Sequence, residues 1–387
     1  MTTDQSPSAA RGGPDRVSPE LWWLCGILMV GAFAALLDGS IVNVAIDTLT
    51  TTFHSTLPTV QWVITGYLLA LCVSIPVSGW AMERFGPKRV WIVAQAIFLL
   101  GSVLSGAAWS DHALIAFRVL QGLGGGLIMP VGQALLAQSA PRAQLTRLMG
   151  LVSVPVMVAP VVGPALGGVV IDDMGWRWIF YLNVPLCLAV MALSVRRIAD
   201  PVARTPRRLD LTGLALLTPG LVALLYGLSE AGSSGGFGGT ASVTGISVGL
   251  ALLVASTVHA LRGPASSRLL DLRLLRRRYF TAGTAASFVL SAAMYGALIM
   301  MPLYFQTLRG DSAMKAGLLL VPQGVGYVIA VGIVGKVAER IGVRAVTLIG
   351  VTLAVGGTIP FALSDAHTSE AMLGAALFVR GFGFGSS

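Results

Sequence analysis

The segment Gly79-Trp-Ala-Met-Glu-Arg-Phe-Gly-Pro-Lys-Arg89 decides the fold, because it returns later as Gly335-Lys-Val-Ala-Glu-Arg-Ile-Gly-Val-Arg-Ala345. Two glycines, a glutamate and an arginine recur at the same positions, 256 residues apart, and each copy lies between two long apolar runs. Self-similarity at a fixed distance indicates an internal structural repeat. The sequence therefore predicts two similar helical units, each with the same short loop between two of its helices.

Composition places these units in a lipid bilayer. Of the 387 residues, 55% are hydrophobic and only 11% are charged, so a water-soluble surface cannot be assembled from them. A helix needs roughly 20 apolar residues to cross about 30 Å of hydrocarbon. We count twelve spans, which begin near residues 22, 60, 90, 113, 148, 178, 211, 241, 280, 316, 345 and 371. The predicted fold class is an all-α polytopic membrane protein.

Basic residues predict the orientation of these spans. Of the 26 Lys and Arg residues, 21 fall in the N-terminal segment and in alternate loops. Such loops face the cytoplasm by the positive-inside rule, so the N-terminus is expected inside and the protein in the plasma (inner) membrane. The net charge of +9 is thus a topology signal and does not indicate a nucleic-acid partner. Residues 1–20 are polar and are expected to form a disordered cytoplasmic tail.

Cysteine and histidine give no reason to expect a cofactor or a metal. Cys25, Cys72 and Cys187 all lie inside predicted spans, where small apolar filling is the ordinary role. No pair of histidines has the spacing of zinc or haem ligands. A membrane-embedded enzyme would need clustered ionisable or thiol side chains in its spans, so the protein is not expected to be an enzyme.

Charges inside the spans are the candidate functional residues. Asp38 is the only acidic residue well inside an apolar run, and Arg118 and Arg380 are the only such basic residues. Intramembrane ionisable groups are costly and are functional candidates by default. Asp38 lies nine residues from Asp47, and Arg118 seven from Asp111, so their depths agree within about one helical turn. We expect the two to pair, either for a function or as a static staple between helices.

Small residues form faces on the span of Arg118 and on the next span, and the latter also holds prolines. Gly122 with Gly126, and Ala159 with Gly163 and Gly167, form faces that let neighbouring helices approach closely. The second of these spans also holds three prolines, which weaken a helix so that it can bend. Tight packing and bending both remain open for this span. The prolines are Pro155, Pro160 and Pro164.

These motifs together resemble a known family. Leu37-Asp-Gly-Ser-Ile-Val-Asn-Val-Ala45 is similar to the first-helix signature of the fourteen-helix drug:proton antiporter branch of the major facilitator superfamily. Arg118-Val-Leu-Gln-Gly122 resembles the fourth-helix motif of that superfamily, and Gly163-Pro-Ala-Leu-Gly-Gly168 its antiporter motif in the fifth helix. The stretch from Trp176 through Asn183-Val-Pro185 resembles the entry to the sixth helix.

The resemblance implies two pseudo-symmetric bundles around a central cavity. The N-terminal six-helix bundle would span residues 21–197, two extra linking helices with basic cytoplasmic loops 198–278, and an incomplete C-terminal bundle with four of six helices 279–387. Twelve of an expected fourteen spans would then be present. Either the chain is a fragment of a longer product or the protein is truncated, which keeps a non-transporting remnant as an alternative.

The same resemblance implies roles for single residues. Asp38 would take part in proton coupling, and Arg118 would bias the proton affinity of its carboxylate. The antiporter motif would comprise Pro160, Gly163, Pro164, Gly167 and Gly168. The cytoplasmic gate would comprise Gly79, Glu83, Arg84, Gly86, Lys88 and Arg89, with Gly335, Glu339, Arg340 and Gly342 in the second copy. Glu83 stands where the family usually has aspartate and Pro87 where it has a basic residue, so gate geometry is expected to differ.

The expected function is proton-coupled export of small hydrophobic or amphiphilic compounds, such as drugs or antibiotics, by a monomer in contact with lipid. Nothing in the sequence resembles an ATPase, so the proton gradient is the expected energy source and no cofactor is expected. Uptake of a nutrient by another major facilitator is an alternative, against which the antiporter motif speaks.

Overall fold

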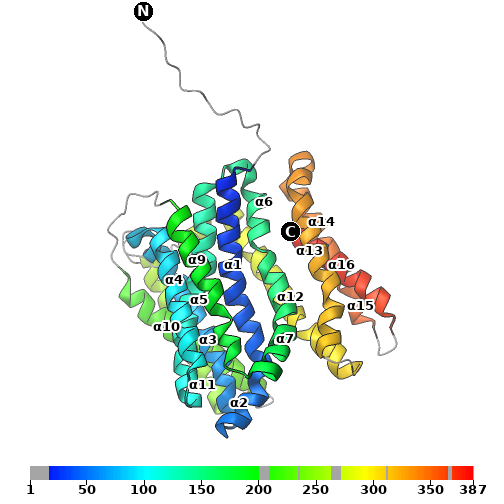
Figure 1. Ribbon diagram of the computed structural model, residues 1–387. Coiled ribbons are helices and arrows are strands. Elements are labelled where there is room, and N and C mark those ends of the chain that lie inside the picture. The colour runs from blue at the N-terminus through cyan, green and yellow to red at the C-terminus, as the bar shows by residue number, and fades with distance from the viewer. Residues whose placement is uncertain are drawn as a thin grey trace, which may run out of the picture.

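The computed structural model describes residues 17–199, 209–233, 236–262, 272–310, 313–364 and 368–386 (Figure 1). These residues form helices joined by short turns, and no β-strand occurs among them. The predicted all-α fold class is confirmed. The first sixteen residues of the predicted tail lie outside the described residues, and helix α1 begins within that predicted tail, at Pro19.

The N-terminal half forms one tightly packed group of helices. Its long helices are mutually packed, with α5 lying against both α3 and α4, and α1 lying against α7 and α9. Its elements are α1 Pro19–Ile41, the 3₁₀ turn η1 Val42–Ala45, α2 Ile46–Phe53, α3 Leu57–Phe85, α4 Pro87–Gly106, α5 Asp111–Ser139, α6 Arg142–Val152, α7 Val154–Met174, α8 Trp178–Tyr181 and α9 Asn183–Arg197.

Local sequence signals set several of these helix boundaries. The Ser18 side chain accepts a hydrogen bond from the Leu21 amide at 3.3 Å, and Ser110 accepts one from Ala113 at 3.2 Å, so each serine satisfies an amide that the first turn leaves without a helical partner. Prolines occupy the first turns of α3 and α4, where their missing N–H costs nothing. The boundaries of α1, α3, α4 and α5 thus follow from residues that a sequence reader can recognise.

Two linking helices, α10 Leu211–Ser233 and α11 Thr240–Arg262, pack closely on each other. A Cβ atom at Gly227 or Gly249 would overlap the backbone of the opposite helix, so glycine permits this approach. Trp62 of α3 stacks on Tyr226 of α10, with ring centroids 6.2 Å apart. Helices α10 and α11 therefore lie on the outer side of the N-terminal helices, away from α13–α16 (Figure 1).

The C-terminal half repeats part of the first arrangement. α13 packs on α16 as α3 packs on α5, and α14 packs on α16 as α4 packs on α5. Its elements are the 3₁₀ turn η2 Leu272–Arg276, α12 Arg278–Leu303, the π-helical turn η3 Tyr304–Leu308, α13 Ala313–Ile341, α14 Val343–Gly356, α15 Ile359–Ala362 and α16 Glu370–Ser386. The predicted repeat of helical units is therefore visible in the packing.

The two halves meet where α6 and α7 lie against α13. A Cβ atom at Gly150 would lie 3.0 Å from the Val331 side chain, and one at Gly335 would lie 3.5 Å from Arg147. Tyr327 and Val331 form a small apolar cluster with residues of both halves. We call this contact the seam; it lies toward the end of the molecule at which α1 begins (Figure 1).

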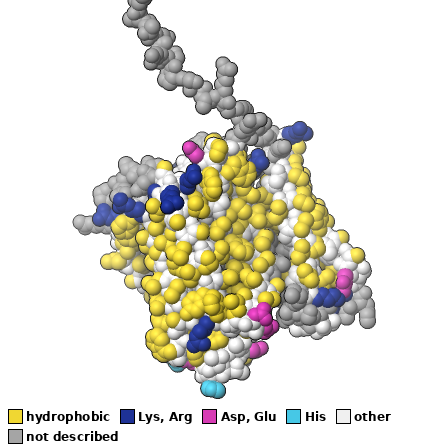
Figure 2. Space-filling view, in the orientation of Figure 1, with side chains coloured by type: hydrophobic (Ala, Val, Ile, Leu, Met, Phe, Trp, Pro, Cys, Tyr) yellow, Lys and Arg dark blue, Asp and Glu magenta, His cyan; other side chains and the backbone are white. Residues whose placement is uncertain are grey.

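A broad hydrophobic face covers the middle of the helices, while most of the visible Lys and Arg side chains gather at the end where α1 begins (Figure 2). Within the described ranges, nine helices are long and apolar enough to cross a membrane, or ten if a bent pair counts as one span. The predicted spans near 280 and 371 correspond to α12 and α16, which are helical but fall outside these nine. The prediction of twelve spans is therefore not confirmed.

Candidate functional site

Asp38 and Arg118 meet in the interior of the N-terminal half. Nη1 of Arg118 donates to Oδ2 of Asp38 at 2.5 Å, and both residues have 1% or less of their surface exposed. Asp38 lies near the end of α1, and Arg118 lies two turns after the start of α5. The two residues were expected to pair because they lie at similar depths along their spans. The predicted pairing of these two residues is present in the structure.

Two amide side chains complete the surroundings of the carboxylate. Nε2 of Gln121 and Nδ2 of Asn183 both donate to Oδ1 of Asp38, each at 2.9 Å. Asn183 also donates to the Ser102 hydroxyl at 3.0 Å, and that hydroxyl donates to the Phe180 carbonyl at 2.8 Å. Both oxygens of the carboxylate are therefore hydrogen-bonded, by residues from α5 and α9.

Arg118 has further partners that do not depend on Asp38. Its Nη1 also donates to Oε1 of Gln121 at 2.6 Å, and its Nε donates to the Val63 carbonyl at 3.2 Å. The guanidinium carbon lies 4.1 Å from the centroid of the Tyr67 ring, a distance at which a cation is attracted to the π face. The ring is itself fixed, because the Tyr67 hydroxyl donates to the Ala35 carbonyl at 3.1 Å.

Pairing Asp38 with Arg118 lowers the free-energy cost of burying their charges. A single charged side chain at the centre of a bilayer costs about 3 kcal/mol on insertion scales, and more where it cannot reach water. Pairing a carboxylate with a guanidinium cancels the net charge, and the added amide and carbonyl partners offset the lost hydration. The arrangement places a carboxylate, Asp38, and its polar partners beside the apolar cluster that α1, α3, α4, α5 and α9 form.

Glycines in the predicted antiporter helix bring α7 against α1 near this site. A Cβ atom at Gly163 would overlap the Ser40 side chain, and one at Gly167 would lie 2.7 Å from the Ile41 side chain. Ser40 donates to the Ala159 carbonyl at 3.1 Å, which adds a polar contact between the two helices. Gly168, by contrast, has nothing within 4 Å. The small-residue face of this span is therefore used for close packing two residues from Asp38.

The same span is also bent. The axes of its two parts, Gln144–Pro160 and Val162–Met174, differ by 45°. Pro160 and Pro164 both lie inside α7, and proline removes a helical hydrogen bond and kinks the axis. Close packing and bending therefore coexist in one span.

The two copies of the repeated loop have the same form. Gly86 alone separates α3 from α4, and Gly342 alone separates α13 from α14. Gly79 and Gly335 lie inside the preceding helices, about two turns earlier. Lys88 donates to the Val195 carbonyl of α9 at 3.1 Å. Glu83, Arg84, Arg89 and Arg340 are exposed, and the side chain of Glu339 lies outside the described residues.

Gln121, Asn183 and Ser102 belong to the site, but the sequence alone did not identify them as site residues. Gln121 lies one helical turn after Arg118, a spacing at which side chains share a face, so it was accessible from sequence. Ser102 and Asn183 are brought in only by the packing of α4 and α9 against the core. Within the described residues, no group of three His, Cys, Asp or Glu could hold a metal ion.

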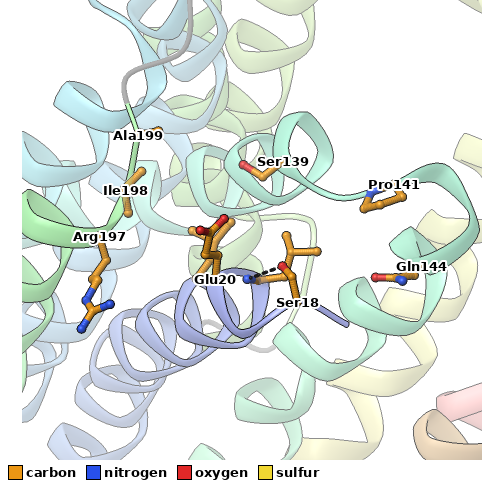
Figure 3. A pocket seen from close by; sticks show the side chains of 10 residues that line it. Ser18, Glu20, Ser139, Pro141, Gln144, Arg197, Ile198 and Ala199 are labelled. Carbon is orange, nitrogen blue, oxygen red and sulfur yellow. Dashed lines mark hydrogen bonds between the residues drawn. The ribbon is translucent and has the colours of Figure 1, made fainter. Parts of the chain in front are cut away.

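A separate hollow of about 390 Å³ lies beside the start of α1 (Figure 3). Ser18 and Glu20 begin α1 on one side of it, Ser139 and Gln144 flank the α5–α6 turn, and Arg197 ends α9. No predicted site residue lines this hollow. The buried Asp38 site and this hollow are thus distinct parts of the structure.

A family model described as Major Facilitator Superfamily matches residues 28–387. The chain belongs to the major facilitator superfamily. It is 35% identical over 382 residues to the Multidrug resistance protein B homolog of Mycobacterium tuberculosis, which covers 98% of this chain and 71% of that relative. It is 33% identical over 341 residues to the Putative multidrug resistance protein MdtD of Escherichia coli, which covers 88% of this chain and 70% of that relative.

Among solved structures, the proton:xylose symporter XylE bound to 6-bromo-6-deoxy-D-glucose has the same fold, with a TM-score of 0.65 at 15% identity over 95% of this chain and 80% of the symporter. The resemblance to the drug-transporter branch is confirmed, since the relatives carry the name multidrug resistance protein. The protein is a multi-pass membrane transporter of this superfamily and not a member of an enzyme family.

Proposed function

We propose that the chain is a proton-coupled secondary exporter of small hydrophobic or amphiphilic compounds. It would work as a monomer in the plasma (inner) membrane, with its N-terminus in the cytoplasm, without a cofactor and without a nucleic-acid partner. The buried Asp38 carboxylate with its compensating partners is the observation that carries the proposal. The names of the relatives support drugs as the class of substrate, which makes antibiotic resistance the expected phenotype.

The network around Asp38 suits a group that changes its protonation state. A proton on Oδ2 removes the negative charge and the main reason for Arg118 to stay there. The guanidinium then keeps its bonds to Gln121 and Val63 and its place over Tyr67, which offset part of the cost of a buried cation that has lost its counter-ion. Gln121 and Asn183 still donate to Oδ1. Both protonation states can thus exist, with a weaker hold of α5 on α1 in the protonated one.

Alternating access would involve two contacts, the seam between the halves and the contact between α1 and α7. The seam joins the halves at the end of the molecule that we place in the cytoplasm, so this structure would correspond to a state closed on that side. Asp38 lies two residues from Ser40, which contacts the bent helix α7. A change at Asp38 could therefore reach the seam through α7, which itself contacts α13.

The test is transport by the 387-residue chain in everted membrane vesicles. The parent chain should accumulate a lipophilic dye when a proton gradient is applied and lose that activity when an uncoupler is added. Asp38→Asn keeps size and polarity but cannot titrate, so it should insert normally and lose gradient-driven uptake. Parental uptake by Asp38→Asn would refute proton coupling at this residue. No uptake by the inserted parent chain would favour the non-transporting remnant.

A further inference from the structure

Arg380 is a second buried guanidinium, in the C-terminal half. It is 1% exposed, and it donates to Oε1 of Gln323 at 3.0 Å and to the Ala293 carbonyl at 3.2 Å. Its Nε has no hydrogen-bond partner among the residues that the structure describes. The guanidinium carbon lies 5.1 Å from the centroid of the Phe384 ring. Unlike Arg118, this cation is held by neutral groups alone.

The internal repeat shows what is missing beside Arg380. Gln323 lies 256 residues after Tyr67, the spacing of the repeated loop, and each of these residues contacts the arginine of its own half. The residue 256 positions after Asp38 is Met294, next to the Ala293 carbonyl that Arg380 contacts. The C-terminal half therefore keeps an arginine, 262 residues after Arg118, and has the thioether of Met294 at the loop-repeat spacing from the Asp38 carboxylate.

The acidic residues of the neighbouring helices do not act as a counter-ion for Arg380. The segments of α12 and α14 contain no Asp or Glu, and α13 and α16 contain only Glu339 and Glu370. Glu370 lies ten residues from Arg380, about 15 Å along the helix, and it pairs instead with Lys315 at 2.7 Å. Glu339 lies near the far end of α13, sixteen residues from Gln323. A buried cation without a counter-ion is costly, which makes this position a strong site for an anion.

The position of Arg380 connects it with the interface between the halves. Phe384 and Met294 pack against Tyr327 and Val331, in the cluster that also includes Val154 of α7. The Phe384 ring under the Arg380 guanidinium belongs to this cluster, so Arg380 is joined to the interface through Phe384.

We propose that Arg380 and Gln323 bind the carboxylate of an amphiphilic acid, and that the transported compounds include such acids. The proposal rests on the proposed export function. The free Nε–H and the neighbouring Nη2 form the edge with which arginine binds a carboxylate in a bidentate manner. Phe384 and Met294 would contact the hydrocarbon part of the acid. The guanidinium is buried in this structure, so entry of the acid requires the helices around Arg380 to separate.

The test compares a dansyl-labelled undecanoic acid with its primary amide, which has the same shape and no charge. Both are titrated into the chain in phosphatidylcholine nanodiscs at about pH 9, with empty nanodiscs as the blank, and dansyl emission is recorded. The parent chain should bind the acid at least tenfold more tightly than the amide, as expected for one buried charge-assisted pair of roughly 1.5–3 kcal/mol. Equal affinities for the acid and the amide would overturn the proposal.

Three variants sharpen this result. Arg380→Gln should abolish the preference for the acid, Arg380→Lys should retain part of it, and Lys315→Gln, which removes a half-exposed charge paired with Glu370, should leave it unchanged. If Arg380→Gln does not fold, Arg380→Lys replaces it in the comparison. A reduced but measurable preference for the acid over the amide is then expected. A full preference in either Arg380 variant would overturn the proposal.

Binding without a gradient also separates this inference from proton-coupled export. Asp38→Asn should bind the acid normally while it loses gradient-driven uptake. Loss of uptake with no acid preference in the parent would refute the anion site alone. Acid preference in a parent chain that shows no gradient-driven uptake would refute coupled export and leave the anion site standing.

Discussion

Gly86 and Gly342, 256 residues apart, have almost the same backbone conformation. Their φ and ψ angles are 86° and 145° for Gly86 and 85° and 148° for Gly342. Each residue alone turns one helix into the next, and its amide donates to the carbonyl four residues earlier. Side chains rarely adopt this region of φ and ψ, so the glycines of the repeated loop are required by geometry.

We therefore predict that Gly86→Ala and Gly342→Ala each lower stability by about 1–3 kcal/mol. Thermal unfolding in detergent, followed by tryptophan fluorescence, measures the effect. Gly79→Ala is the control, because Gly79 is helical and a Cβ atom there meets nothing within 4 Å. Equal unfolding temperatures for Gly86→Ala and Gly79→Ala would contradict the argument.

The contact between α7 and α1 gives a second prediction. A methyl group at Gly163 overlaps the Ser40 side chain, so Gly163→Ala should push α7 from α1 and weaken the bond from Ser40 to the Ala159 carbonyl. Overpacking of this kind costs roughly 1–3 kcal/mol. Gly168→Ala lies on the same helix with open space around it and should be neutral. Unfolding temperature and initial rate of dye uptake are measured for both, and a neutral Gly163→Ala would show that the helices tolerate separation.

Orientation in the membrane gives a third prediction. Thr56 directly precedes α3 and Ser139 is the last residue of α5; both are exposed, at opposite ends of the N-terminal helices. The distribution of basic residues places Ser139 inside and Thr56 outside. In a background without Cys25, Cys72 and Cys187, Thr56→Cys should react with a membrane-impermeant maleimide in intact cells, and Ser139→Cys only after lysis. The reverse pattern would invert the topology.

The amide partners of Asp38 give a fourth prediction. Asn183→Ala removes one donor to Oδ1 of Asp38 and the partner of the Ser102 hydroxyl, so it should destabilise the chain by about 1–3 kcal/mol. Asn43→Ala is the matched control, because the Asn43 amide is exposed and donates to the carbonyls of Gly39 and Ser40, one turn earlier in the chain. If the Asn183 effect arises through Asp38, it should shrink in an Asp38→Asn background. Simple additivity of the two changes would place the Asn183 effect elsewhere.

The site could be predicted from sequence only where single helices determine it. Depth along α1 and α5 was enough to pair Asp38 with Arg118, and the prolines of α7 indicated its bend. Asn183 could not be placed in this way, because the break between α8 and α9 and the packing of α9 on α1 decide where its amide lies. The turn Val42–Ala45 interrupts the first span, and it contains no proline or glycine from which the interruption could be predicted.

The roles of Asp38 and Arg118 in transport stay predictions, and Arg118 offers the sharper test. Arg118→Lys keeps the positive charge but replaces a planar fork by a point charge, which cannot bond Asp38, Gln121 and the Val63 carbonyl together. The ion pair survives in weakened form, so the chain should still fold and insert. We expect gradient-driven dye uptake to fall at least tenfold while the unfolding temperature changes little.

Arg196→Lys makes the same chemical change at an exposed position at the end of α9 and should transport normally. The comparison separates a mobile pair from a static staple between α1 and α5. A static staple predicts that loss of uptake follows loss of stability, in proportion, through Arg118→Lys and Arg118→Gln. A pair that exchanges partners during transport predicts that Arg118→Lys loses uptake at nearly parental stability. Parental uptake by Arg118→Lys would leave the arginine with a structural role alone.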